Sequence, residues 1–147
     1  MNVKNNKRGQ ETQQKIEDAF VTLLQEKSLR EVEVSEICEL AQINRSTFSA
    51  HYDSVSALAN AFCEKTEEIV LAQPHTADDY TWLFACIKNH RQRFSAYFKL
   101  GIREVRADYK TLFLRSAIHG VAKLWFENGC VETVDKMGKL LMREISR

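Results

Sequence analysis

The segment 45–51 carries the most distinctive set of hydrogen-bonding side chains in this 147-residue chain. If the segment is helical, the residues that face outward from it are Arg45, Ser46, Thr47, Ser49, Ala50 and His51. None of these is acidic, so none repels a phosphate group. An arginine such as Arg45 can donate two hydrogen bonds to the edge of a guanine, and Thr47 and His51 suit phosphate oxygens. The segment therefore predicts a surface that contacts double-stranded DNA.

Short helices are predicted to hold this surface in place. Segments 34–41 and 45–51 predict two helices joined by about three residues, and Asn44 is a suitable N-cap for the second helix. A longer helix is predicted over residues 12–27, where apolar residues recur with the spacing of one helical face. The residues predicted to face inward behind the second short helix are Ile37, Ala41, Phe48 and Tyr52. This pattern is typical of a helix-turn-helix.

The charge of the chain limits how such a surface could bind DNA. Formal net charge is +1, so the whole protein is not a polycation. Residues 1–10 are polar and basic without apolar periodicity, which predicts a flexible arm. Its side chains Lys4, Lys7 and Arg8 could add phosphate contacts that are independent of sequence. Any DNA affinity must then come from a local surface and from the pairing of two copies.

The remaining pattern predicts an all-α protein of about eight helices in two domains. Residues 1–53 form the predicted helix-turn-helix domain with its arm, and residues 54–147 form a small helical domain for effector binding and dimerisation. Asp53 or Ser54 is predicted to cap a fourth helix that continues to about Ala72. A long helix is predicted to stop at Asn128-Gly129, because glycine accepts the left-handed conformation there. Thr133 is predicted to cap the last helix, and no segment alternates as a strand would.

Two sets of apolar residues in the second domain have candidate roles. A two-fold four-helix interface between copies of the chain is predicted from Ile118, Gly120, Val121, Trp125, Met137, Leu141 and Ile145. A cavity for a small apolar or aromatic effector is predicted from Phe84, Phe94, Tyr97, Phe98 and Phe113. An aromatic stripe with helical spacing is also typical of an ordinary core, so both interpretations of these rings stay open.

The sequence contains few features that are typical of other classes of function. No nucleophile elbow, phosphate-binding glycine loop or zinc-protease motif occurs, so an enzyme is not expected. The four cysteines and four histidines are scattered, so neither a metal site nor a disulfide framework is predicted, and no cofactor is expected. No apolar run approaches membrane-spanning length, and the N-terminus does not resemble a signal peptide. A reducing cytoplasmic location is expected.

Residues 12–58 resemble the N-terminal domain of the tetracycline-repressor (TetR) family of transcriptional regulators. The stretches that carry the resemblance are TQQKIEDAFVTLLQEKSLREVEVSEICELAQINRSTF and HYDSVSAL. The C-terminal stretch SAIHGVAKLWFENGCVETVDKM also resembles the terminal helices of that family. The resemblance implies a third helix that contacts DNA through Arg45, Ser46, Thr47 and His51, two final helices that form a homodimer, and an effector pocket between these regions.

The sequence departs from the family pattern at four positions. The family usually has tyrosine at the position of Ser49, a phosphate-binding lysine at Val55, threonine or serine at Glu33, and glycine at Gln42. The first three changes each remove a phosphate contact, and Glu33 adds a negative charge. The expected function is a dimeric repressor that binds a pseudo-palindromic operator and is released by an effector. The alternative is a relative with weak or lost DNA binding that serves as a protein-partner or small-molecule-binding module.

Overall fold

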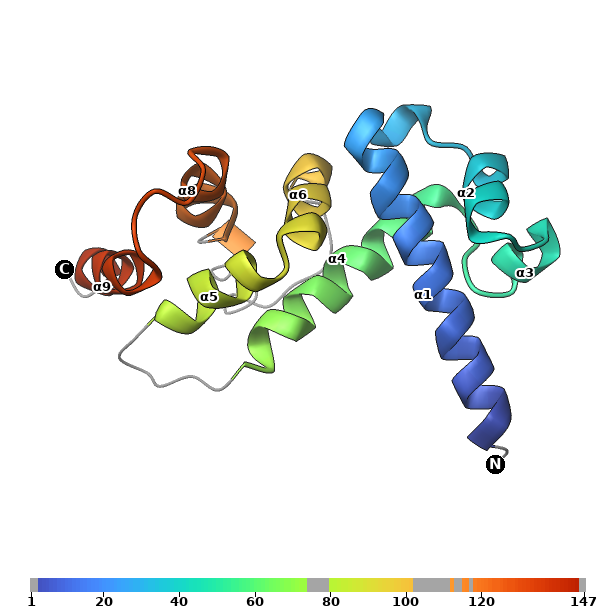
Figure 1. The fold of residues 1–147 in the computed structure, drawn as a ribbon, viewed down its shortest axis with the longest axis horizontal. Coiled ribbons are helices and arrows are strands. Elements are labelled where there is room, and N and C mark those ends of the chain that lie inside the picture. The colour runs from blue at the N-terminus through green and yellow to red at the C-terminus, as the bar shows by residue number, and fades with distance from the viewer. Residues whose placement is uncertain (1–2, 74–79, 102–111, 113–114, 117, 146–147) are drawn as a thin grey trace. The chain divides into compact units, whose positions relative to one another are not determined.

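The computed structural model describes residues 3–73, 80–101, 112, 115–116 and 118–145. Within these residues the chain has eight α-helices, a 3-10 turn and a π-helical turn, and no strand, which confirms the all-α prediction (Figure 1). The chain divides into two compact units, residues 1–63 and 64–147. The division falls inside helix α4 (Val55–Leu71), whereas the pattern of the sequence suggests a boundary at 53/54.

The first unit is a small bundle around the long helix α1. It contains α1 (Val3–Glu26), the 3-10 turn η1 (Leu29–Glu31), α2 (Val34–Ala41), α3 (Arg45–Ser49) and the beginning of α4. Helix α2 packs against both α1 and α3 (Figure 1). The core is apolar, and Phe20 of α1 meets Phe62 of α4 edge to face with ring centroids 5.8 Å apart. Ser54 caps α4, since its hydroxyl accepts a hydrogen bond from the amide of Ala57 at 3.1 Å.

The prediction of a flexible arm at residues 1–10 is wrong for the part that the structure describes. Helix α1 begins at Val3 and includes the positions of Lys4, Lys7 and Arg8. The segment contains Lys4, Lys7, Arg8 and Gln10, which are good helix formers, and a nucleated helix gains one hydrogen bond for each residue added. A single glycine in the segment is not enough to stop this extension. The side chains of Lys7 and Arg8 are exposed on this helix.

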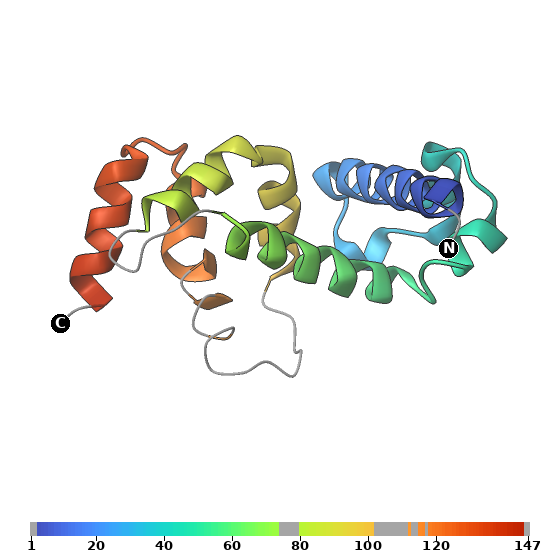
Figure 2. The same cartoon turned by 90° about the horizontal axis from the view of Figure 1, so that it is seen from below.

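The second unit contains the end of α4 and five further helical elements. These are α5 (Thr81–Asn89), α6 (Arg91–Leu100), the π-helical turn η2 (Ile118–Ala122), α8 (Lys123–Glu127) and α9 (Val134–Ile145). Helices α5 and α9 pack side by side (Figure 2). The predicted long helix falls partly on residues 102–111, outside the described residues. Its predicted stop is confirmed, because α8 ends at Glu127 and Gly129 has a φ of +81°.

Two further observations bear on the class of protein. The described helices include none that is long and apolar enough to cross a membrane. Among the same residues, no three histidine, cysteine, aspartate or glutamate side chains lie together as a metal ion would require.

Thr133 caps α9 as predicted, since its hydroxyl accepts a hydrogen bond from the amide of Lys136 at 3.3 Å.

Candidate nucleic-acid interface

Helices α2 and α3 are joined by a tight turn, Gln42–Asn44, and residues 34–52 are called the α2–α3 motif below. Gln42 is in the left-handed conformation, with φ 54° and ψ 49°. Its amide donates to the carbonyl of Glu39 at 3.2 Å, and the amide of Ile43 donates to the carbonyl of Cys38 at 3.0 Å. These two bonds form the helix-ending arrangement in which glycine usually supplies the left-handed residue. The turn therefore has a defined geometry although it lacks a glycine.

The inner face of α3 is anchored as the sequence predicts. Phe48 is 1% exposed and Tyr52 is 9% exposed, and their rings contact each other with centroids 5.9 Å apart. Ile37 and Ala41 of α2 are buried as well. Burial raises the pKa of Tyr52, and the nearby carboxylate of Glu17 raises it further, so the phenol stays neutral. This packing fixes the orientation of α3 within the first unit.

The outer face of α3 carries the residues predicted to contact DNA. Arg45, Ser46, Ser49 and Ala50 are exposed, whereas Thr47 and His51 are half-buried. Helix α3 ends at Ser49, two residues earlier than predicted, so Ala50 and His51 lie in the turn that follows. The six positions are thus brought together on one short segment.

Asn44 stands at the N-cap position of α3 but does not cap it with its side chain. Its backbone is extended, with φ −81° and ψ 155°, as an N-cap requires. No hydrogen bond joins its side chain to the first turn of the helix. The carbonyl of Asn44 instead accepts the first helical hydrogen bond, from the amide of Phe48 at 3.1 Å. The predicted position is therefore right and the predicted capping bond is absent.

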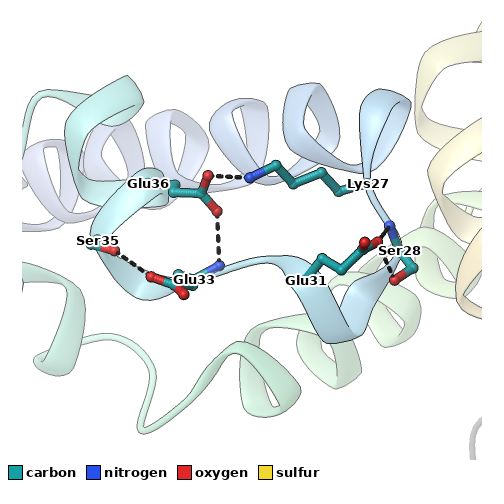
Figure 3. Close-up of polar contacts among 6 residues, drawn as sticks. All are labelled: Lys27, Ser28, Glu31, Glu33, Ser35 and Glu36. Carbon is teal, nitrogen blue, oxygen red and sulfur yellow. Dashed lines mark hydrogen bonds and ion pairs between the residues drawn. The ribbon is translucent and has the colours of Figure 1, made fainter.

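An acidic cluster surrounds the N-terminus of α2, as Figure 3 shows. The amide of Glu33 donates to Glu36 Oε2 at 3.2 Å, and the hydroxyl of Ser35 donates to Glu33 Oε2 at 3.2 Å. Glu36 also forms an ion pair with Lys27. The hydrogen bond from Lys27 lowers the pKa of Glu36, as does the hydrogen bond from the amide of Glu33, so both effects keep the carboxylate charged.

This cluster matters because the N-terminus of a helix is otherwise a favourable place for a phosphate. Two carboxylates of the chain itself, Glu33 and Glu36, stand there instead, and Lys27 pairs with one of them. Sequence reasoning singled out Glu33 but missed the roles of Lys27 and Glu36. The signal was present, since Ser28-x-x-Glu31 and Glu33-x-x-Glu36 both have the spacing of a capping box.

Three of the aromatic residues proposed for an effector pocket, Phe94, Tyr97 and Phe98, form a packed cluster in the second unit, and Phe84 packs against Trp125. Phe84, Phe94 and Tyr97 are at most 1% exposed, and Phe98 is also buried. The ring of Phe94 lies 5.9 Å from each of Tyr97 and Phe98, centroid to centroid. Phe113 lies outside the described residues. Mutual contact between these rings is what a core requires.

A separate groove of about 300 Å³ lies in the first unit, between α1 and α2. No pattern in the sequence predicts this groove. The residues that line it are Lys15, Asp18, Ala19, Thr22, Leu40, Ala41 and Gln42. It is open to solvent and mixed in character, with one basic and one acidic side chain beside an exposed leucine at position 40.

The residues proposed for a dimer interface divide into two groups. Trp125, Met137 and Leu141 are buried within the second unit itself, where Trp125 meets Phe84 edge to face at 5.2 Å. Val121 is half-buried and Gly120 is exposed. The side chains of residues 118 and 145 lie outside those that the structure describes. The first group therefore contributes to the core of a single chain.

Large apolar side chains that the interface prediction did not name are exposed in the second unit. Leu124 is 60% exposed, Val131 is 80% exposed and Leu140 is 37% exposed. Periodicity alone places Leu124 and Trp125 in the same broad apolar band. The structure separates them, because Trp125 points into the core, where its indole N–H donates to the carbonyl of Glu132 at 3.0 Å.

Comparison of the chain with protein-family models, with curated protein sequences and with solved structures found no match. The candidate interface therefore has to be judged from its own residues and geometry.

Proposed function

We propose that the protein is a DNA-binding transcriptional regulator, a repressor that acts as a homodimer on a pseudo-palindromic operator. The observation that carries the proposal is the α2–α3 motif. Its three-residue turn and the buried rings of Phe48 and Tyr52 support a short helix at a fixed angle, and the outward residues of that helix include no acid. A helix presented in this way suits the major groove of DNA, as in a helix-turn-helix.

Within this proposal, Arg45 is the residue that distinguishes bases. Its side chain is exposed at the first position of α3, where an arginine can reach the edge of a guanine. Ser46, Thr47 and His51 then contact the phosphate backbone. Lys7 and Arg8 are held on α1 and add contacts that do not depend on sequence. In this assignment Arg45 recognises the base sequence, and the phosphate contacts position the protein on the DNA.

Dimerisation belongs to the second unit in the proposal, because a single motif with a near-neutral chain has little affinity of its own. The exposed side chains of Leu124, Val131 and Leu140 supply apolar surface for contact with a second copy. Release by a small apolar or aromatic effector is the remaining part of the proposal. It requires the packed rings of Phe94 and Tyr97 to separate, since they contact each other directly.

A specific observation favours a second function. Glu33 and Glu36 bring negative charge to the N-terminus of α2, on the same motif as Arg45. The second function is that of a relative of DNA-binding regulators that has lost strong DNA binding and serves as a protein-partner or small-molecule-binding module. Negative charge at this position would not impair such a protein.

A mobility-shift experiment distinguishes the two functions. The full-length protein is titrated against DNA from upstream of its own gene and against random duplex of equal length, at several salt concentrations. Tighter binding to one duplex that weakens with salt supports the regulator. If no duplex binds better than random DNA at low salt, the regulator is refuted. Arg45→Ala is then compared with Arg30→Ala, a control at an exposed arginine outside α3, and only the first should relax the preference at one base position.

A further inference from the structure

The second unit contains a buried ionic group that neither DNA contact nor dimerisation uses. Arg115 Nε donates to Glu67 Oε1 at 2.7 Å, and a terminal nitrogen of Arg115 donates to Glu67 Oε2 at 2.7 Å. The hydroxyl of Tyr97 also donates to Glu67 Oε1, at 2.9 Å. The side chains of Arg115 and Glu67 are only 8% and 7% exposed. A paired charge in this setting is costly to disturb, because removal of one partner leaves the other buried and uncompensated.

His119 lies against the same group through its ring. Its imidazole centroid is 4.7 Å from that of Tyr97, with the planes 33° apart, and 5.9 Å from that of Phe98. The side chain is half-buried, so water can deliver a proton to it while much of the ring stays within the cluster. Two aromatic surfaces from α6 therefore hold a titratable ring next to a buried ion pair.

The charges around His119 disfavour its protonated form. In the part of the chain that the structure describes, the charged groups that act on it are Lys123, Glu67 and Arg115. Burial lowers the pKa of His119 below its ordinary value, Lys123 and Arg115 lower it further, and Glu67 opposes them. Of these three groups Glu67 favours the cation, and its two oxygens already accept three hydrogen bonds from Arg115 and Tyr97. Lys123 itself lies 3.5 Å from Glu127.

The backbone at His119 departs from regular α-helix. His119 belongs to the π-helical turn Ile118–Ala122, which leads directly into α8. Single π-helical turns are rare and often occur at functional sites. The ring contacts of His119 with Tyr97 and Phe98 join this turn to α6.

We propose that the second unit contains a proton-operated conformational switch, in which neutral His119 closes the cluster of Tyr97 and Phe98 and protonated His119 leaves it. The imidazole takes a proton from hydronium in the solvent, which becomes water, and the resulting cation beside Arg115 and Lys123 gains hydration by moving outward. Its departure uncovers one face of Tyr97, whose hydroxyl hydrogen-bonds Glu67. The switch does not depend on the proposed function in DNA binding.

The direction of the pH effect follows from the shift. In the open state, as in the unfolded chain, His119 is hydrated and binds its proton near the ordinary pKa of about 6.5, whereas the closed state binds it only at lower pH. The contribution of His119 to the stability of the closed state is therefore fully present above pH 6.5, and it is lost as the pH falls through the lowered pKa. Between 6.5 and the lowered pKa, the ratio of open to closed molecules rises by up to about tenfold per pH unit.

The test is a titration of the full chain from pH 7.5 to pH 5, followed by near-ultraviolet circular dichroism for aromatic packing and far-ultraviolet circular dichroism for helix content. The wild type and the control His90→Gln, which replaces an exposed histidine, should lose near-ultraviolet signal below pH 6.5 while helix content is largely kept. His119→Phe keeps an aromatic ring without a charge and should show no such loss. His119→Arg should show the acid spectrum already at pH 7.5.

Two results would overturn the proposal. One is a wild-type near-ultraviolet spectrum that is constant over this range, which would mean that cation–π attraction to Tyr97 retains the charged ring in place. The other is a transition in His119→Phe that equals that of the wild type. If His119→Arg does not fold, as judged by its far-ultraviolet spectrum, the comparison between wild type and His119→Phe decides alone.

Discussion

Replacement of Gln42 by glycine should stabilise the first unit, although most substitutions at a helix end destabilise a protein. Gln42 has φ 54° and ψ 49°, which is the left-handed region. For a residue with a β-carbon, this conformation raises the free energy of the folded state by about 1–2 kcal/mol, whereas glycine adopts it without this strain. Glycine also lowers the free energy of unfolding by about 0.4–1 kcal/mol, because it increases the conformational entropy of the unfolded chain. The net gain lies between about 0 and 1.6 kcal/mol, with a midpoint of about 0.8 kcal/mol.

The measurement is urea unfolding of wild type and Gln42→Gly, followed by circular dichroism at 222 nm. We expect a higher midpoint with an unchanged slope, since the two hydrogen bonds that close the turn use backbone atoms only. Glu39→Gly is the matched control, because Glu39 is exposed on the same helix three residues earlier. It should lose about 1 kcal/mol, as glycine does in the interior of a helix.

The two variants therefore have opposite signs. If Gln42→Gly lowers the midpoint as Glu39→Gly does, the left-handed turn is not a source of strain, and the account of how α2 and α3 are joined is wrong.

Three further predictions concern single side chains. Glu33→Thr removes a carboxylate from the N-terminus of α2, and in fluorescence anisotropy it should tighten DNA binding at low salt and have less effect at high salt, because the repulsion that it removes is screened by ions; unchanged affinity at low salt would contradict a role in excluding phosphate. Arg115→Met should lower the free energy of unfolding by about 3–5 kcal/mol because Glu67 stays buried without its partner, and the double change to Arg115→Met with Glu67→Leu should recover much of the loss. Ser54→Ala should cost about 1 kcal/mol through loss of the cap of α4, whereas Ser56→Ala, at an exposed position inside that helix, should cost nothing because alanine has the higher helix propensity; equal losses in urea unfolding would argue against the cap.

The parts of the fold that follow from local rules could be predicted from the sequence. Phe48 and Tyr52 are buried as their spacing indicates, and Gly129 and Thr133 mark the helix ends that glycine and threonine favour. Each of these depends on residues within one or two turns. The start of α1 was missed because apolar periodicity marks the face of a helix that packs, whereas the helix itself continues through polar residues with good propensity.

Predictions that depend on packing between elements were less complete. Trp125 and its neighbour Leu124 belong to one apolar band in the sequence, and only the arrangement of the second unit shows that the first is buried and the second 60% exposed. The ion pair of Glu67 with Arg115 joins residues 48 positions apart, so no local pattern could reveal it. Gln42 shows a third kind of limit, since its left-handed conformation is imposed by the turn rather than favoured by its own residue type.

The central proposal is that the α2–α3 motif places α3 in the major groove and that the protein binds DNA as a homodimer. Selection of DNA duplexes from a random library with the full-length protein tests it most directly. The account predicts enrichment of a pseudo-palindrome whose half-sites lie about one helical turn, or a multiple of it, apart, with a guanine preference that Arg45→Ala relaxes. Recovery of a library with no enriched sequence, at salt low enough for binding, would contradict it.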